Sequence, residues 1–77
     1  MTKQRDAPKP FGEKLRELRK AKKFTQYAFA QRVGIDVKTL RAYEYGTHLP
    51  NIYNAVDLAD ALNVSLDELT GRRGPRM

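Results

Sequence analysis

Apolar side chains recur every three to four positions along most of the chain, which is the spacing of one face of an α-helix. Phe11, Leu15 and Leu18 lie on such a stripe, and charged residues cover the positions between them. The pattern therefore predicts a first helix over residues 11–22. A second long stripe, which contains Leu58 and Leu62, predicts another helix between residues 51 and 63.

The stretch between these two segments predicts a pair of short helices joined by a glycine. Thr25 and Asp36 can each cap a helix N-terminus, because a side-chain oxygen accepts a hydrogen bond from an unpaired backbone N–H. Gly34 and Gly46 can end these helices, since glycine enters the left-handed conformation without a Cβ clash. Helix, glycine turn and helix within about 22 residues indicate a helix-turn-helix.

The end of the chain adds one more short helix. Asn51 is expected to cap the fourth helix and Asn63 to stop it. Ser65, with Glu68 three residues later, forms a capping-box pattern that predicts a fifth helix over Leu66–Thr70.

Several spaced motifs together resemble one known family. TQ at residue 25, an apolar–Ala pair, VGI, and a polar helix that closes on YEYG look like the phage Cro and repressor family, also called the XRE class. The likeness continues through LRELRKAKKF upstream and LPNIYNAVDLADALNVSLDELT downstream, and so covers roughly residues 11–70. It implies an all-α, compact, five-helix, phage-repressor-like DNA-binding domain, with the helix-turn-helix at its second and third helices.

The resemblance also implies structural roles for particular residues. Arg19 is expected to pair with Glu44 and so to tie the first helix to the end of the third. Gly34 and Gly46 are expected to shape the turns. Lys23 departs from the family pattern, which commonly has glycine there. It must therefore either adopt a positive φ, at a cost of about 1 kcal/mol, or allow a differently shaped turn.

Length and charge bound the organisation of the chain. Seventy-seven residues suffice for one small domain, expected at 11–70, between a flexible basic arm at 1–10 and a flexible basic tail at 71–77. The net charge is +8 over residues 1–41, −5 over 42–71 and +3 over 72–77. This separation of charge either orients a basic side towards a polyanion or merely keeps the surface soluble.

Composition argues against several classes of function. The chain has no cysteine and one histidine, so neither a disulfide nor a metal site is expected. No nucleophile-and-base arrangement, glycine-rich phosphate loop or dinucleotide motif occurs, and we expect no enzyme activity, no cofactor and no small-molecule ligand. No signal peptide or membrane span is predicted, so a cytoplasmic, nucleoid-associated protein is expected.

The third helix carries the residues suited to reading DNA, because the second helix of a helix-turn-helix enters the major groove. Its outward positions are predicted to contact bases: Val37, Lys38, Arg41 and Ala42. Arginine and lysine can bond guanine, and the two apolar residues suit a thymine methyl. Alternatively, Lys38 and Arg41 touch phosphates only.

A further set of polar residues near this helix is predicted to contact phosphates without reading sequence. These residues are Tyr27, Thr39, Tyr45, Thr47 and His48. The family resemblance implies that Gln26 also hydrogen-bonds the DNA backbone and helps to position the recognition helix. Tyr27 and Tyr45 could instead border the core.

Together these features predict a transcriptional regulator, most simply a repressor, that binds double-stranded DNA as a homodimer at an inverted repeat. Val56, Leu66 and Leu69 are the candidate residues of the dimer surface, although Leu66 and Leu69 could instead close the core. The alternative is a protein-interaction module on the same fold, such as an antitoxin or the partner of another regulator.

Overall fold

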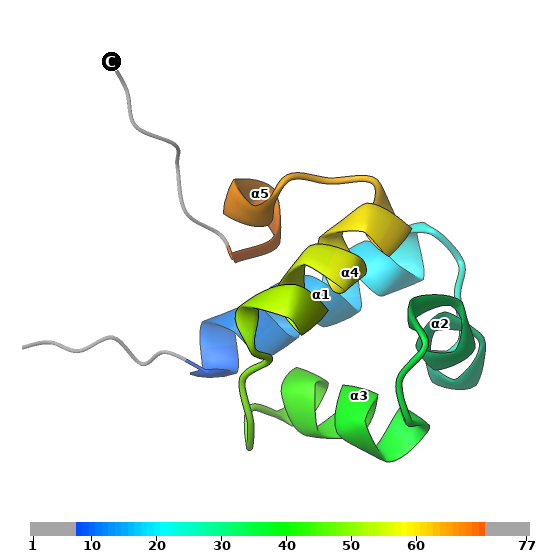
Figure 1. Cartoon of the computed structure of the whole chain (residues 1–77), viewed down its shortest axis with the longest axis horizontal. Helices are drawn as coiled ribbons and strands as arrows, with labels where there is room; N and C mark the ends of the chain where they lie inside the picture. The colour runs from blue at the N-terminus through cyan, green and yellow to red at the C-terminus, as the bar shows by residue number, and fades with distance from the viewer. Residues whose placement is uncertain (1–7, 71–77) are drawn as a thin grey trace, which may run out of the picture.

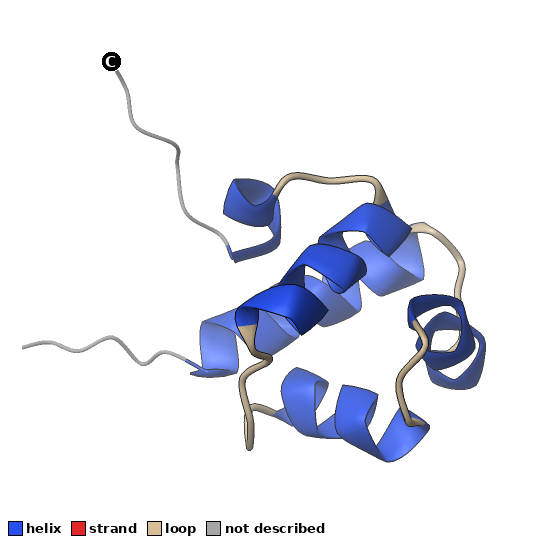
Figure 2. Ribbon diagram, viewed as in Figure 1, coloured by secondary structure: helices blue, strands red, loops and turns tan. Residues whose placement is uncertain are grey.

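The computed structural model of the chain describes residues 8–70. In this part of the chain there are five helices and no strand: α1 (Pro8–Ala21), α2 (Gln26–Val33), α3 (Val37–Tyr45), α4 (Ile52–Leu62) and α5 (Leu66–Thr70) (Figure 2). Figure 1 shows α4 in front of α1, with α3 at the edge of the molecule opposite α5. The predicted all-α, five-helix fold is confirmed.

The first helix begins earlier than its apolar stripe predicts, at Pro8 rather than at Phe11. Proline is tolerated in the first turn of a helix, where its missing N–H would have no intrahelical acceptor. The stripe therefore marks the part of α1 that meets the core and not its N-terminal end. The rest of the predicted basic arm and the whole predicted tail lie outside the described residues.

Local hydrogen bonds define the helix-turn-helix. The Thr25 side chain accepts a bond from the backbone N–H of Ala28 at 3.0 Å, and α2 ends at Gly34 with φ 91°. Asp36 accepts from the N–H of Lys38 at 3.3 Å, and α3 ends at Gly46 with φ 86°. The caps and stops predicted from the sequence are thus confirmed for both helices.

The other predicted turns follow the same local rules. Asn51 caps α4 by accepting from the N–H of Asn54 at 2.8 Å, and Asn63 ends that helix with φ 59°. The Ser65 hydroxyl accepts from the N–H of Glu68 at 3.0 Å, which is the Ser65 half of the predicted capping box. Lys23 has φ 65°, so the first of its two predicted conformations is the observed one.

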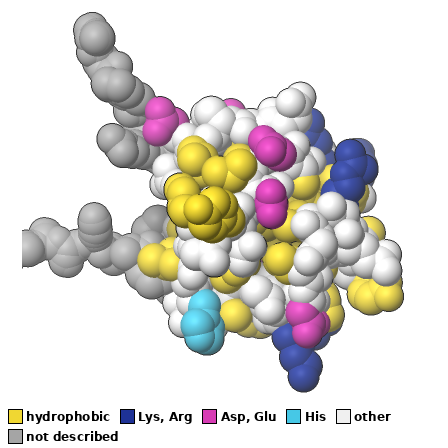
Figure 3. Space-filling view, viewed as in Figure 1, with side chains coloured by type: hydrophobic (Ala, Val, Ile, Leu, Met, Phe, Trp, Pro, Cys, Tyr) yellow, Lys and Arg dark blue, Asp and Glu magenta, His cyan; other side chains and the backbone are white. Residues whose placement is uncertain are grey.

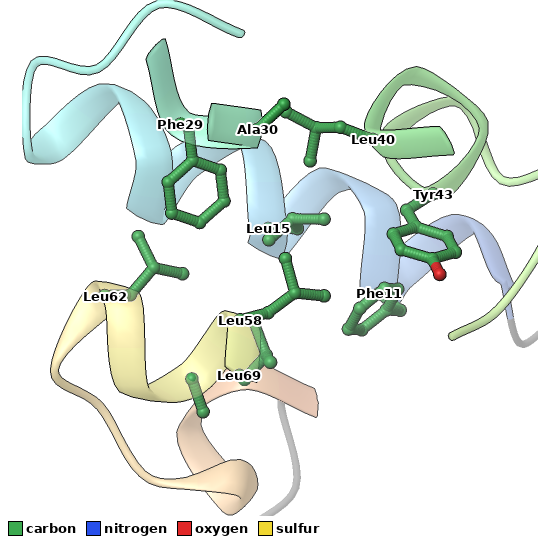
Figure 4. Packing of buried hydrophobic residues seen from close by; sticks show 10 residues of the cluster. Phe11, Leu15, Phe29, Ala30, Leu40, Tyr43, Leu58, Leu62 and Leu69 are labelled. Atoms are coloured by element: carbon green, nitrogen blue, oxygen red, sulfur yellow. The ribbon is translucent and has the colours of Figure 1, made fainter. Parts of the chain in front are cut away.

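Each helix contributes to one core (Figure 4). Leu15, Phe29, Leu40, Leu58 and Leu69 come from five different helices, and none of them is exposed to solvent. Of the two predicted places for Leu69, its burial confirms the core and corrects the dimer surface. The short α5 has to lay this side chain into the core, because so small a domain leaves few other ways to close it.

No helix within residues 8–70 combines the length and the apolarity that crossing a membrane requires.

Candidate nucleic-acid interface

The inner face of α3 anchors this helix to the rest of the domain. Leu40, Tyr43 and Glu44 are buried, and the Tyr43 hydroxyl accepts a hydrogen bond from Asn54 Nδ2 at 3.0 Å. This bond links α3 to α4 near the outer edge of the core. The anchoring leaves the opposite face of α3 at the molecular surface.

The outer face of α3 presents two cations. Lys38 and Arg41 are both exposed, and their three-residue spacing places them on one side of the helix, as predicted. Val37 and Ala42 are only half exposed, which corrects the expectation that all four positions face outwards. Val37 packs against the core because it lies one helical turn before the buried Leu40.

An open hollow of about 480 Å³ lies between α3 and the start of α4. Four residues predicted to contact DNA line it, namely Lys38, Thr39, Ala42 and His48. Asn51, which caps α4, and Asn54 within α4 also line the hollow. The structure thus brings side chains from the third helix and from the following loop to one depression beside the N-terminus of α4.

A buried ion pair supports the end of α3. Arg19 Nε donates to Glu44 Oε2 at 2.6 Å and Arg19 Nη2 donates to Glu44 Oε1 at 3.1 Å, while both residues are almost fully buried. Arg19 Nη1 also donates to the carbonyl of Phe24, at 2.8 Å. The pairing implied by the family resemblance is present. The bond from Arg19 to Phe24 also holds the turn that contains Lys23.

Gln26 connects this ion pair to the outer face of α3. Its Nε2 donates to Glu44 Oε1 at 3.0 Å, and its Oε1 accepts from Arg41 Nε at 3.2 Å. Gln26 itself is half-buried. Two residues predicted to contact DNA, one on α2 and one on α3, are therefore in direct contact with each other.

The remaining predicted phosphate contacts lie at the surface. Tyr27 and Tyr45 are both 63% exposed, so the alternative that they border the core is wrong. Thr47 is exposed, and its hydroxyl donates to the carbonyl of Ala42 at 3.2 Å, which helps to close the C-terminal end of α3. The Thr47 hydroxyl oxygen can still accept a hydrogen bond, but its hydrogen is already donated to Ala42.

Sequence reasoning missed two contributors to the site. Asn54 holds Tyr43 and lines the hollow, but its position inside a predicted helix gave it no separate signal. Gly12 lies inside α1, where a Cβ would meet the backbone oxygens of Glu44 and Tyr43 at 2.4 and 2.6 Å. A glycine within a helical pattern was the available clue to this close approach.

Charge is distributed unevenly over the domain. The acidic residues of α4 and α5 are Asp57, Asp60, Asp67 and Glu68, while α3 exposes Lys38 and Arg41. Figure 3 shows acidic side chains over the α4 and α5 side, where they border a patch of apolar side chains. A polyanion would therefore be attracted to the α3 side and repelled from the α4 and α5 side.

Comparison with known proteins agrees with this geometry. The helix-turn-helix family model of the XRE type matches residues 15–69, which is most of the chain. The chain belongs to this family. Members of the XRE-type family are DNA-binding transcriptional regulators, which are not a class of enzyme.

One similar protein is the cryptic phage CTXphi transcriptional repressor RstR of Vibrio cholerae, which is 45% identical over 60 residues. That match covers 78% of this chain and 54% of RstR, so the chain spans about half the length of this relative.

Two solved structures share the fold. The restriction-modification controller protein C.AhdI of Aeromonas hydrophila superposes with a TM-score of 0.78 at 35% identity, covering 80% of this chain and 94% of that protein. The P22 c2 repressor, solved in complex with a synthetic operator, gives a TM-score of 0.73 at 34% identity, covering 77% and 89% respectively. These likenesses confirm the phage-repressor-like architecture expected from the sequence.

Proposed function

We propose that the chain regulates transcription, most simply as a repressor, by binding double-stranded DNA with α3 in the major groove. The observation that carries this proposal is the outward placement of Lys38 and Arg41 on the second helix of a helix-turn-helix. Membership of the XRE-type family and the operator complex of the structurally similar P22 c2 repressor support it.

Base recognition is assigned to the exposed side of α3. Arg41 can donate two bonds to the O6 and N7 atoms of guanine, and Lys38 can reach the same acceptors with less directional preference. Val37 and Ala42, being half exposed, can offer apolar contact to a thymine methyl. Sequence preference would therefore be concentrated at the few base pairs that face this helix.

Phosphate binding is assigned to the borders of α3. The start of α4 borders the hollow that Thr39 and His48 line, and the first N–H groups of a helix can bind phosphate. On the other border, Tyr27 is exposed near the start of α2, and Gln26 retains one amide hydrogen. Such contacts would position α3 without reading sequence.

Selection from a random pool of duplex DNA at about 150 mM salt tests the proposal, because non-specific phosphate binding is already weak at that ionic strength. We expect enrichment of an inverted repeat whose half-sites are about one helical turn, roughly 34 Å, apart. A pool that shows no enrichment would contradict DNA reading and favour the protein-interaction alternative.

Replacing Arg41 by alanine tests its role in base reading. Arg41→Ala should weaken binding to the selected operator by about 1–3 kcal/mol and relax the preference at one base step, because a bidentate guanine contact is lost. The measurement is fluorescence anisotropy on the operator and on variants changed at single positions. Equal weakening on every sequence would instead make Arg41 a phosphate contact.

We also propose that the protein binds DNA as a homodimer through the N-terminal half of α4. Ile52, Tyr53 and Val56 are 60%, 79% and 38% exposed, and Leu49 just before the helix is 55% exposed. Val56 lies four residues after Ile52 and three after Tyr53, so it is next to both on the helix surface and the three form one apolar face. A contiguous exposed apolar face of this kind is typical of an interaction surface.

This face revises the dimer surface expected from the sequence. Of the three residues predicted there, Val56 belongs to the exposed face, Leu66 is half-buried against the core and Leu69 is fully buried. Because α4 follows α3 after one short loop, a two-fold axis at this face would keep two copies of α3 near each other.

A polar substitution tests the dimer. Tyr53→Ser should shift sedimentation equilibrium towards monomer and weaken binding to a full inverted repeat more than to a single half-site, because only the full site uses both copies. The matched control is Glu17→Ser at an exposed position of α1, which should change neither measurement. A wild-type protein that stays monomeric both free and on the full site would contradict the proposal.

A further inference from the structure

Four side chains from three helices are bonded in a line from the core to the DNA-reading face. Arg19 of α1 is bonded to Glu44 of α3, Glu44 to Gln26 of α2, and Gln26 to Arg41 of α3. Burial decreases along the line: Arg19 and Glu44 are 6% and 4% exposed, Gln26 is half-buried and Arg41 is exposed. The line thus connects the buried ion pair of the fold to an exposed candidate base-reading group.

The chemistry of each link determines the orientation of the next. A carboxylate only accepts hydrogen bonds, so Glu44 Oε1 must face the NH₂ group of Gln26. The amide oxygen of Gln26 therefore points away from Glu44, towards a group that must donate. Arg41 Nε is such a group, because a guanidinium only donates. A reversed amide would place acceptor against acceptor and donor against donor.

This geometry makes glutamine particularly suitable at position 26. Glutamate there could accept from Arg41 but would bring a second carboxylate against Glu44, and lysine could not accept from Arg41 at all. Methionine would approximate the length of glutamine but lacks both polar groups. The two bonds of Gln26 can therefore be removed together with little change in side-chain volume.

The contact leaves the reading edge of Arg41 available. Gln26 engages only Nε, so the hydrogens on Nη1 and Nη2 remain for the O6 and N7 atoms of a guanine. A free arginine side chain has many rotamers and loses that freedom on binding, whereas a tethered one has already lost part of it. A tether on Nε would therefore favour a single presentation of the guanidinium to the groove.

We infer that Gln26 is a positioning residue that holds Arg41 through its Nε, anchored by the buried Arg19–Glu44 pair, and so sharpens the preference for guanine at one base step. This inference rests on the proposed DNA reading by α3. It assigns to Gln26 a contribution to specificity that a phosphate contact alone would not make, because phosphate contacts carry no direct sequence information.

The test compares Gln26→Met with the wild type on the selected operator and on the same operator with the guanine read by Arg41 replaced by 7-deazaguanine. The affinity ratio is the affinity for the selected operator divided by that for the 7-deazaguanine operator. Gln26→Met should lower this ratio by about three- to tenfold, the effect expected from immobilising one flexible side chain. In an Arg41→Ala background, the same substitution should leave the ratio unchanged. If Gln26 touches only phosphate, Gln26→Met should weaken binding to both DNAs equally and leave the affinity ratio at its wild-type value. That result would overturn the inference.

Gln31→Met is the matched control. Gln31 lies on the same helix, is exposed, and donates to the Tyr27 hydroxyl at 3.3 Å instead of to an α3 side chain. This substitution should not change the affinity ratio. Urea unfolding of both variants shows whether each remains folded during the binding measurement.

A measurement without DNA separates failure of this inference from failure of the proposed function. In the free protein, the Arg41 Nε–H should exchange with water more slowly than that of the exposed Arg16, and Gln26→Met should abolish the difference. Equal exchange at Arg41 in the wild type and in Gln26→Met would show that the tether is absent, whatever the protein binds. If the Arg41 Nε–H exchanges slowly but the protein selects no DNA, the bond between Gln26 and Arg41 exists but the proposed DNA reading is wrong. The inferred role of Gln26 in specificity is then wrong as well.

Discussion

Gly12 shows how one residue determines the distance between two helices. A Cβ at this position would lie 2.4 Å from the Glu44 backbone oxygen and 2.8 Å from its carbonyl carbon. Both atoms belong to the backbone of α3, which cannot move aside as a flexible side chain can. The absence of a side chain at Gly12 therefore allows α1 and the C-terminal end of α3 to pack backbone against backbone.

Gly12→Ala is predicted to destabilise the fold, although alanine is the better helix former. Because all the contacted atoms belong to backbone, the clash should cost about 3 kcal/mol, the upper part of the usual range for overpacking, against the roughly 1 kcal/mol that alanine gains over glycine in a helix interior. Urea unfolding followed by circular dichroism measures the difference. An unchanged or higher midpoint would show that relieving the clash costs no more than alanine gains as a helix former.

Lys23 illustrates the opposite case, in which a single residue tolerates an unfavourable conformation. Its φ of 65° costs a lysine about 1 kcal/mol. Two hydrogen bonds between Arg19 and Phe24 close the turn around this residue. The Phe24 N–H donates to the Arg19 carbonyl, and Arg19 Nη1 donates to the Phe24 carbonyl. These bonds of Arg19 therefore stabilise the turn although it has lysine where the family commonly has glycine. The same arginine side chain also forms the buried ion pair.

At the scale of the helix, α3 combines a stabilising cap with a charge that is unfavourable for its proposed partner. Asp36 accepts from the N–H of Lys38, and its negative charge is favourable at the positive end of the helix dipole. The same charge would repel DNA phosphates near the groove. Capping and binding therefore make opposite demands on this residue.

Asp36→Asn is predicted to keep the helix cap while removing the negative charge that repels DNA. The asparagine oxygen can still cap α3, so stability should change by no more than about 1 kcal/mol. DNA affinity should rise on all sequences alike, by about 0.5–1 kcal/mol near 0.1 M salt, because one repulsive charge is removed. Asp60→Asn, which removes a charge from α4, is the control and should have little effect on affinity. Weaker binding by Asp36→Asn would indicate that Asp36 contacts a base.

At the scale of the whole molecule, the charge pattern predicts which side meets DNA. Lys20 near the end of α1 and Lys22 in the turn after it are both exposed, so the basic N-terminal half of the sequence does not present all its cations on α3. The proposed docking uses Lys38 and Arg41 and leaves the outer face of α1 in solvent. Net charge alone would not distinguish these two faces.

Neutralising each face in turn tests this orientation. The double substitution Lys20→Gln with Lys22→Gln should leave operator affinity within about twofold at 0.15 M salt, because exposed charges beyond a Debye length are screened. Lys38→Gln should weaken binding by about 1 kcal/mol or more. The affinities are measured by anisotropy titration. A larger loss from the α1 pair than from Lys38 would place the docking face on α1.

The sequence by itself determined the features that depend on residues close together along the chain. Thr25, Asp36 and Asn51 cap their helices through N–H groups two or three positions away, and a left-handed residue ends each of α2, α3 and α4. Periodicity identified the inward face of each helix for the same local reason. These local rules, together with the family motifs, were sufficient for the five-helix fold and for Lys38 and Arg41 on one side of α3.

Only the tertiary structure decided the features that join distant residues. Gln26 and Arg41 are separated by fifteen positions, so no helical period relates them. The Arg19–Glu44 pair spans twenty-five positions and is equally beyond any helical period, and only the family resemblance implied it. Likewise, Leu69 and Val56 are both apolar residues on amphipathic helices, yet the packing of α5 buries the first and leaves the second exposed. Contacts of this kind depend on how helices are oriented against one another, which hydrophobic periodicity constrains to a face but not to a particular partner.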